Sequence, residues 1–168
     1  MAETLQNHSP TRVVELVVNL DDTTGERLGH AVRLLLDAGA LDVWTTPIAM
    51  KKDRPGVMLS VLVEPGQREV FARDLLEMTG SFGLRMREWD RLVLDRDWVE
   101  VRTRLGTLKL KVGRLQGRVV AVKPEFEQVA QLARQAGVSI IEAQDAALAA
   151  ADAYRARHNA NDQPAEVR

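Results

Sequence analysis

The chain has 168 residues, of which 45% are hydrophobic and 28% are charged, and its formal net charge at pH 7 is -1. This length suits one domain or two small ones with a buried core, and the near-neutral charge excludes a general nucleic-acid-binding protein, which normally carries a basic excess. The chain has no cysteine, which excludes disulfides, iron–sulfur clusters, thiolate zinc sites and thiolate catalysis within it.

The N-terminal segment, residues 1–11, is polar, and we predict a flexible tail. It contains no hydrophobic signal core, and no apolar run farther along the chain approaches the length of a membrane span. These features predict a cytoplasmic protein with no membrane partner.

Residues 12–95 predict a first domain. Short β-branched or alternating runs predict strands, and apolar stripes at helical spacing predict helices, the first of which ends at Gly39. The expected strands cover residues 13–18, 41–50, 57–63 and 84–94, and the expected helices cover 24–38 and 66–78. The order strand, helix, strand, strand, helix, strand is that of the ferredoxin-like βαββαβ unit, an antiparallel sheet with its helices on one face.

Residues 96–156 predict a second, smaller domain with a β-hairpin and two helices, so the predicted fold class is α+β. The hairpin strands cover 98–103 and 107–115 and turn near Leu105–Gly106, and a short strand covers 118–122. Pro124 is expected to be the first residue of a helix that ends at Gly137. The expected apolar side of this helix is formed by Phe126, Val129 and Leu132.

The last helix is rich in alanine and follows Ser139 and Glu142, whose spacing is that of a capping box. The remaining residues, 157–168, are polar and include a proline, so we predict a second flexible tail.

The segment NLDDTTGE, residues 19–26, is rich in acids and lies between the first predicted strand and helix. Asp21, Asp22 and Glu26 offer hard oxygen ligands, which suit magnesium or manganese. Alternatively, Thr23 and Glu26 form a capping box, and the helix dipole favours the acids. Capping needs only one acid and therefore explains the pair of aspartates poorly.

The segment KKDRPG, residues 51–56, gathers three cations in a predicted turn. Lys51, Lys52 and Arg54 are able to bind phosphate oxygens, with Arg54 forming a bidentate contact. Alternatively, the segment is a solvated hairpin turn with a positively charged end.

Two further segments have an unusual composition. Residues 101–123 contain no acid but seven cations, which indicates either an exposed strand face or a face that attracts anions. Residues 79–85, TGSFGLR, carry Gly80 and Gly83 and form either a helix-ending turn or a loop that approaches a ligand. His8, His30 and His158 are scattered, with none of the spacings typical of a metal pair, so we expect only weak nickel binding by this chain.

Three motifs in this order resemble those of the nickel-insertion protein family, the pyridinium-3,5-bisthiocarboxylic acid mononucleotide nickel chelatases. NLDDTTGE is similar to that family's NLDDMTGE-type motif, and TPIAMKKDRPGVMLSVL, preceded by GALDVW, is similar to a block with MKKNRPG. The segment KPEFEQVAQLARQAGVSIIEAQDAAL resembles its closing helices. The resemblance covers residues 12–153 and is to the family's C-terminal domain. Thr23 replaces the usual methionine, and Asp53 the usual asparagine.

The resemblance implies a part of a lyase that inserts nickel, its substrate metal, into a pyridinium mononucleotide to form the nickel-pincer cofactor of lactate racemase-type enzymes. It implies that CTP is held by Lys51, Lys52 and Arg54, and that manganese or magnesium is held by Asp21, Asp22 and Glu26. It further implies a homo-oligomer and a separately encoded N-terminal partner, whereas catalytic residues stay unassigned.

The alternative is a non-catalytic ferredoxin-like module for ligand sensing or oligomerisation. Such a module needs no divalent ion and tolerates the loss of Lys51 and Arg54, so triphosphate binding distinguishes the two functions.

Overall fold

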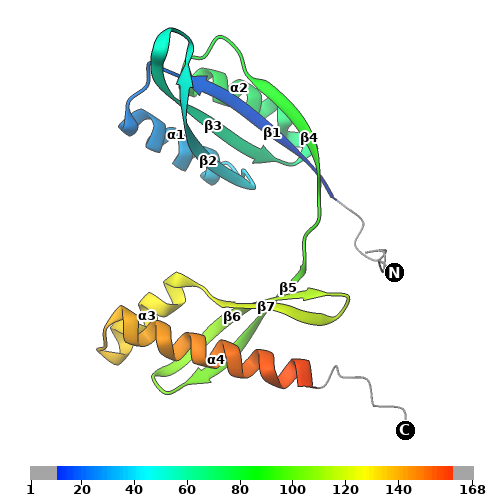
Figure 1. Ribbon diagram of the computed structural model, residues 1–168, viewed down its shortest axis with the longest axis vertical. Helices are drawn as coiled ribbons and strands as arrows, with labels where there is room; N and C mark the ends of the chain where they lie inside the picture. The colour runs from blue at the N-terminus through cyan, green and yellow to red at the C-terminus, as the bar shows by residue number, and fades with distance from the viewer. Residues whose placement is uncertain (1–10, 161–168) are drawn as a thin grey trace. The chain divides into compact units, whose positions relative to one another are not determined.

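The computed structural model describes residues 11–160, which form two compact units, 11–93 and 94–160 (Figure 1). No helix in the described part of the chain is both long and apolar enough to cross a membrane.

The first unit is a four-stranded antiparallel sheet with the strand order β2-β3-β1-β4 (Figure 1). Its elements are β1 Thr11–Leu20, α1 Gly25–Asp37, β2 Asp42–Met50, β3 Arg54–Val63, α2 Arg68–Thr79 and β4 Arg85–Arg91, with short 3-10 turns at Lys51–Asp53 and Pro65–Gln67. This element order and strand order are those of the ferredoxin-like βαββαβ fold, which confirms the predicted fold class.

Alternate residues of the two central strands build the core of the first unit. On β1 these are Val14, Leu16, Val18 and Leu20, which pair with Val63, Val61, Leu59 and Val57 of β3. Apolar side chains of both helices, Leu35, Phe71 and Leu75, pack into the same cluster. The intervening residues of β1, such as Glu15 and Asn19, therefore lie on the other face of the sheet.

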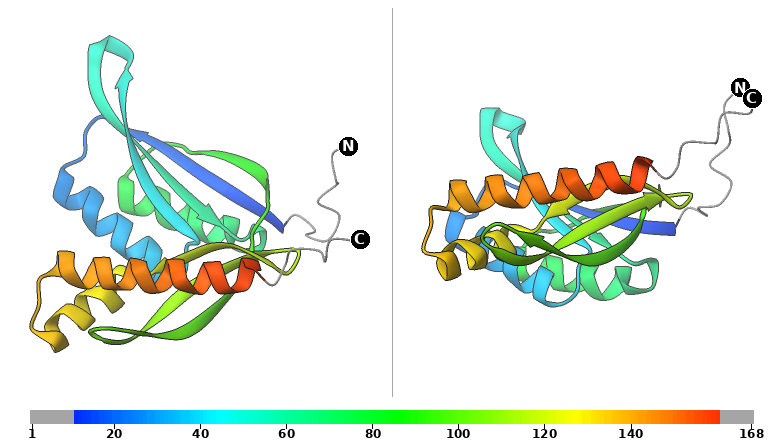
Figure 2. Two further views of the ribbon diagram at one scale, coloured as in Figure 1. Left: turned by 60° about the horizontal axis from the view of Figure 1, so that its bottom comes forward. Right: turned by 90° about the horizontal axis from the view of Figure 1, so that it is seen from below.

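The second unit is a three-stranded antiparallel sheet, β5-β6-β7, with two helices packed on one face (Figure 2). Its elements are β5 Asp95–Thr103, β6 Gly106–Leu115, β7 Arg118–Pro124, α3 Phe126–Ala136 and α4 Ile140–Ala160. Leu108, Leu110 and Val112 of the central strand are buried against helix residues that include Leu132 and Ala147.

The start of α3 differs from the prediction. Pro124 is the last residue of β7, where it pairs with Leu110, and Glu125 is the N-terminal cap of the helix. The prediction that Phe126 lies on the apolar side is also wrong, because this residue is 67% exposed. As the first helical residue, Phe126 precedes the turn that packs on the sheet, whereas Val129 and Leu132 are buried as predicted.

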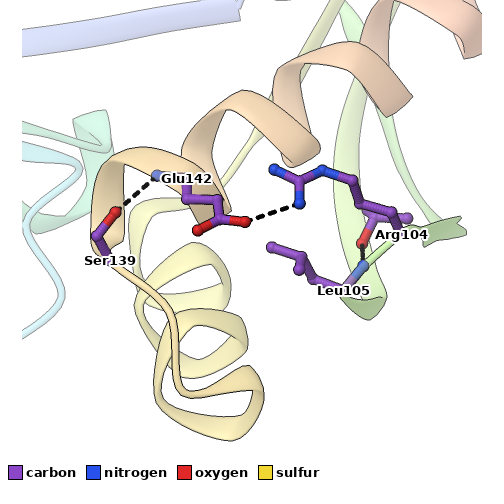
Figure 3. Close-up of polar contacts among 5 residues, drawn as sticks. Arg104, Leu105, Ser139 and Glu142 are labelled. Carbon is purple, nitrogen blue, oxygen red and sulfur yellow. Dashed lines mark hydrogen bonds and ion pairs between the residues drawn. The ribbon is translucent and has the colours of Figure 1, made fainter.

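The start of α4 confirms one half of the predicted capping box (Figure 3). The backbone N–H of Glu142 donates to Oγ of Ser139 at 3.1 Å. The carboxylate of Glu142 is bound by Nη1 of Arg104, at 2.8 Å, in place of the reciprocal bond to the cap residue. This ion pair joins the turn between β5 and β6 to the first turn of α4.

Some residues of both predicted tails belong to regular elements. Thr11 belongs to β1, and Arg157–Ala160 belong to α4. The ring of His158 stacks on Tyr154, with ring centroids 3.9 Å apart, and the last turn of the helix thereby gains a contact that composition did not indicate. The other tail residues, 1–10 and 161–168, lie outside the described residues.

Candidate functional site

The acidic and the basic motif of the sequence meet at one end of the first sheet. Nη1 of Arg54 donates to Oδ2 of Asp21 at 3.1 Å, and these residues lie 33 positions apart in the chain. The β1 strand ends at Leu20, opposite Val57, so the residues that follow β1 lie beside the residues that begin the antiparallel strand β3. The sheet topology therefore creates the contact between the two motifs.

A third segment reaches the same motif from β4. Nη2 of Arg85 donates to Oδ1 of Asn19 at 2.8 Å. Arg85 is the first residue of β4, where it pairs with Val17, and it is also the last residue of the two-glycine segment 79–85. No motif in the sequence predicts a role for Arg85, although Gly80 and Gly83 before it mark the loop.

Neither aspartate of NLDDTTGE caps the helix that follows. The cap is Thr24, in an extended conformation, and its side chain accepts a bond from the N–H of Arg27 at 3.3 Å. The predicted capping box of Thr23 and Glu26 is therefore wrong by one residue, because two consecutive threonines offer the same signal. Asp21 and Asp22 are left without a structural role at the helix start.

We expect Thr24→Ala to lower the free energy of unfolding by about 1 kcal/mol, because it removes the acceptor for a helix N–H group. Thr23→Ala is the matched control and is expected to change it by less than about 0.5 kcal/mol. Urea unfolding of both variants measures the difference. A larger loss for Thr23→Ala would contradict this assignment of the cap.

The turn between β2 and β3 holds its cations in an uncommon backbone conformation. Lys52 has φ 62° and Asp53 has φ 57°, both in the left-handed region. Aspartate and asparagine tolerate this region better than most residues, whereas a lysine there costs about 1 kcal/mol. Lys51, Lys52 and Arg54 are all exposed, so the turn presents three cationic groups to solvent.

Gly56 permits a close approach between this turn and the end of β1. A Cβ atom at this position would lie 2.9 Å from the backbone oxygen of Leu20 and 2.6 Å from Sδ of Met50. Pro55 lies beyond the last residue pair between β1 and β3, so its missing N–H costs no bond to β1. The RPG sequence therefore suits the place where β3 passes the acidic motif.

A shallow groove runs along the same hairpin. It is lined by Pro47, Ile48, Ala49, Asp53, Arg54 and Pro55. Its lining combines apolar side chains with the oppositely charged residues Asp53 and Arg54, and the guanidinium of Arg54 is the group suited to bind an anion there.

The carboxylates do not form a closed metal site by themselves. Asp21 is paired with Arg54, Asp22 and Glu26 are exposed, and residues 11–160 contain no group of three metal-binding side chains. Magnesium and similar ions are commonly held by one or two carboxylates together with substrate phosphates. The donor set fits an ion that is shared with a phosphate group.

Comparison with known proteins gives a consistent result. The family model described as nickel insertion protein matches residues 1–144. A relative of that family from Myxococcus xanthus is 47% identical over 132 residues, which cover 79% of this chain and 34% of the relative. The pyridinium-3,5-bisthiocarboxylic acid mononucleotide nickel insertion protein of Lactiplantibacillus plantarum is 36% identical over 152 residues, covering 90% of this chain and 36% of that protein.

Two solved structures are similar over most of the chain. One is LarC2, the C-terminal domain of a cyclometallase involved in the synthesis of the NPN cofactor of lactate racemase, with a TM-score of 0.81, 38% identity, and coverage of 86% of this chain and 99% of that domain. The other is protein MK0293 of Methanopyrus kandleri, with a TM-score of 0.65, 31% identity, and coverage of 89% and 92%. The chain spans about a third of the length of the curated relatives that it matches.

Proposed function

This chain belongs to the nickel insertion protein family, and we propose that it supplies the CTP- and divalent-metal-binding part of a nickel insertion enzyme. That enzyme matures the nickel-pincer cofactor of lactate racemase-type enzymes, with nickel and a pyridinium mononucleotide as its substrates. The chain is similar to LarC2, a domain involved in the synthesis of this cofactor, and this similarity supports the proposal.

The observation that carries the proposal is the contact between Arg54 and Asp21 at 3.1 Å. A metal–triphosphate complex presents negative oxygens and a positive ion a few ångströms apart, so its binding site needs cations and carboxylates side by side. The β1–α1 loop and the β2–β3 turn provide this combination, and the Asp21 side chain is already partly shielded, with 24% exposure.

The proposed roles of the basic residues follow from their position in the β2–β3 turn. Lys51, Lys52 and Arg54 bind the phosphate oxygens of CTP, and the groove beside Arg54 accepts its ring and sugar. Manganese or magnesium, when bound, neutralises phosphate charge.

The carboxylates and the residues that orient them form the other side of the proposed site. Asp21 and Asp22 hold the ion, with Glu26 in the first turn of α1 as a third donor. Arg85 orients the acidic loop through Asn19.

In this proposal, the remaining functions of the enzyme belong to the part of the family's proteins that this chain does not match. Since the curated relatives are about three times as long as the matched region, we propose that the family's N-terminal part acts together with this chain and holds nickel and the pyridinium substrate. We further propose that the chain assembles as a homo-oligomer.

We expect Lys51→Ala to weaken CTP binding at least tenfold, because a hydrogen bond to a charged group contributes roughly 1.5–3 kcal/mol. Binding of CMP should change less, since its single phosphate makes fewer contacts. Calorimetric titration with both nucleotides measures the ratio. Arg73→Ala, which removes an exposed cation from α2, is the matched control, and an equal loss in this variant would contradict a specific role for Lys51.

Reconstitution tests the function itself. The purified chain is mixed with the separately produced N-terminal part of a relative, nickel, CTP, manganese and the thiocarboxylated pyridinium mononucleotide, and activation of apo-lactate racemase is measured. Activation that requires both proteins, CTP and manganese is the expected result. Full activation without this chain, or without CTP, would contradict the proposal.

A further inference from the structure

The loop between α2 and β4 presents an aromatic side chain that the first unit does not bury. Phe82 is 110% exposed, whereas Phe71 of the same unit lies in its core with 3% exposure. Phenylalanine is enriched in the buried centre of protein–protein interfaces. A single exposed apolar side chain is common on a protein surface, so the significance of Phe82 depends on how its loop is built and where the loop lies.

Hydrogen bonds fix the backbone on both sides of Phe82. The N–H of Ser81 donates to Oγ1 of Thr79 at 3.3 Å, and Oγ of Ser81 donates to the carbonyl oxygen of Gly83 at 2.9 Å. Oγ1 of Thr79 in turn donates to the carbonyl oxygen of Leu75, a core residue, at 2.6 Å. A loop that is already ordered loses little conformational entropy on binding, so Phe82 is a pre-organised anchor.

The loop lies at the end of the first sheet that carries the acidic motif. Arg85, three residues after Phe82, pairs with Val17 and donates to Asn19 of that motif at 2.8 Å. Figure 1 shows the connection between α2 and β4 at the same end of the unit as the turn between β2 and β3. Phe82 therefore belongs to the same end of the unit as the loops to which we assign CTP and the divalent ion.

A groove between α1 and α2 begins near the same loop. It has a volume of about 260 Å³ and is lined by Arg27, His30, Ala31, Leu34 and Met78. Met78 lies in the last turn of α2, two residues before Gly80, and Leu34 of α1 is exposed. The groove therefore offers apolar contacts close to the base of the Phe82 loop.

The length of the relatives indicates which molecule covers this surface. The chain covers 34% and 36% of two curated relatives, so about two-thirds of each relative lies outside the match. LarC2, of which the chain covers 99%, is the C-terminal domain of its protein, so the unmatched part is N-terminal. In the proposed function that part holds nickel and the pyridinium substrate. Two substrates of one reaction must meet, so the N-terminal part needs a contact surface at the end of the unit that binds CTP.

We propose that Phe82 and the α1–α2 groove form the surface on which the N-terminal part of the family's proteins docks. Phe82 enters an apolar pocket of that part, and the groove accepts one of its apolar side chains. The identity of this partner rests on the proposed function, whereas the surface itself is a feature of the described residues.

The test is a calorimetric titration of the full chain with the separately produced N-terminal part of the Myxococcus xanthus relative. We expect saturable binding that Phe82→Ser weakens about tenfold or more, and that Leu34→Ser, in the groove, also weakens. Phe126→Ser, which replaces an exposed phenylalanine of the second unit, is the matched control and should leave the affinity unchanged. Absence of binding to the unmodified chain, or equal losses in Phe82→Ser and Phe126→Ser, would overturn the proposal.

Titration of the same variants with CTP and manganese separates this inference from the proposed function. Phe82→Ser should retain the CTP affinity of the unmodified chain, because Phe82 anchors a protein and does not hold the nucleotide. A loss of CTP affinity in Phe82→Ser would show that the loop approaches the nucleotide, and it would overturn the docking surface. If the unmodified chain bound the N-terminal part but not CTP, the docking surface would be supported and the proposed function would fail.

Sedimentation of the chain alone tests the other possible occupant, a second copy of this chain. Phe82→Ser should sediment as the unmodified chain does. Dissociation of this variant to a smaller species would assign the surface to a second copy and overturn the proposal.

Discussion

Replacing Gly56 with alanine is expected to destabilise the first unit by about 2–3 kcal/mol, as overpacking of a closely packed site does. The added methyl group would lie 2.9 Å from the backbone oxygen of Leu20, and that oxygen belongs to a central strand that cannot move alone. For a unit of this size, the loss corresponds to a fall in Tm of roughly 10–20 °C. Thermal unfolding followed by circular dichroism measures it.

Gly66→Ala is the matched control, because a Cβ atom there meets nothing within 4 Å. It should leave Tm nearly unchanged. If Gly56→Ala melted within a few degrees of the unmodified chain, the hairpin would be free to shift away from Leu20, and the close approach of the two motifs would not be a fixed property of the fold.

Asp21→Asn and Asp22→Asn are expected to remove the metal-dependent part of CTP binding, a loss of about tenfold or more, because a hard cation loses a charged oxygen ligand. The free energy of unfolding of each variant should change by less than about 1 kcal/mol. Neither residue caps α1, and the Arg54 side chain that pairs with Asp21 is 59% exposed, so this ion pair contributes little to stability.

The effect is measured by titrating each variant with CTP at several manganese concentrations. Asp37→Asn, at the exposed end of α1, is the control and should behave as the unmodified chain. Asparagine variants that retain the original manganese dependence would show that the acidic loop does not hold the ion.

The ferredoxin-like unit was predictable because its strands show the period of a half-buried sheet. Val57, Leu59, Val61 and Val63 alternate in the sequence and line one face of β3 in the structure. The meeting of the two motifs follows from that topology, since the end of β1 and the start of β3 adjoin in any antiparallel pair. The strand pattern in the sequence therefore places the two loops at the same end of the sheet.

Other features of the fold and of the candidate site have no signal in the local sequence. The bond between Arg85 and Asn19 joins residues 66 positions apart, and no spacing rule identifies such a pair. The cap at Thr24 and the exposure of Phe126 depend on where a helix begins, and neighbouring residues there satisfy the same pattern. The surroundings of the cations in the segment 101–123 also differ in a way that only the three-dimensional structure shows. Lys111 and Lys123 line the same pocket, whereas Arg114 forms an ion pair with Asp97.

Calorimetric titration of CTP into the purified chain, with and without manganese, distinguishes a metal–nucleotide site from the alternatives. We expect saturable binding in the presence of manganese and at least tenfold weaker binding in its absence, since the acidic loop contributes only through the ion. No heat at millimolar CTP in either condition, or one affinity that is indifferent to manganese, would contradict it and favour a ligand-sensing or oligomerisation module.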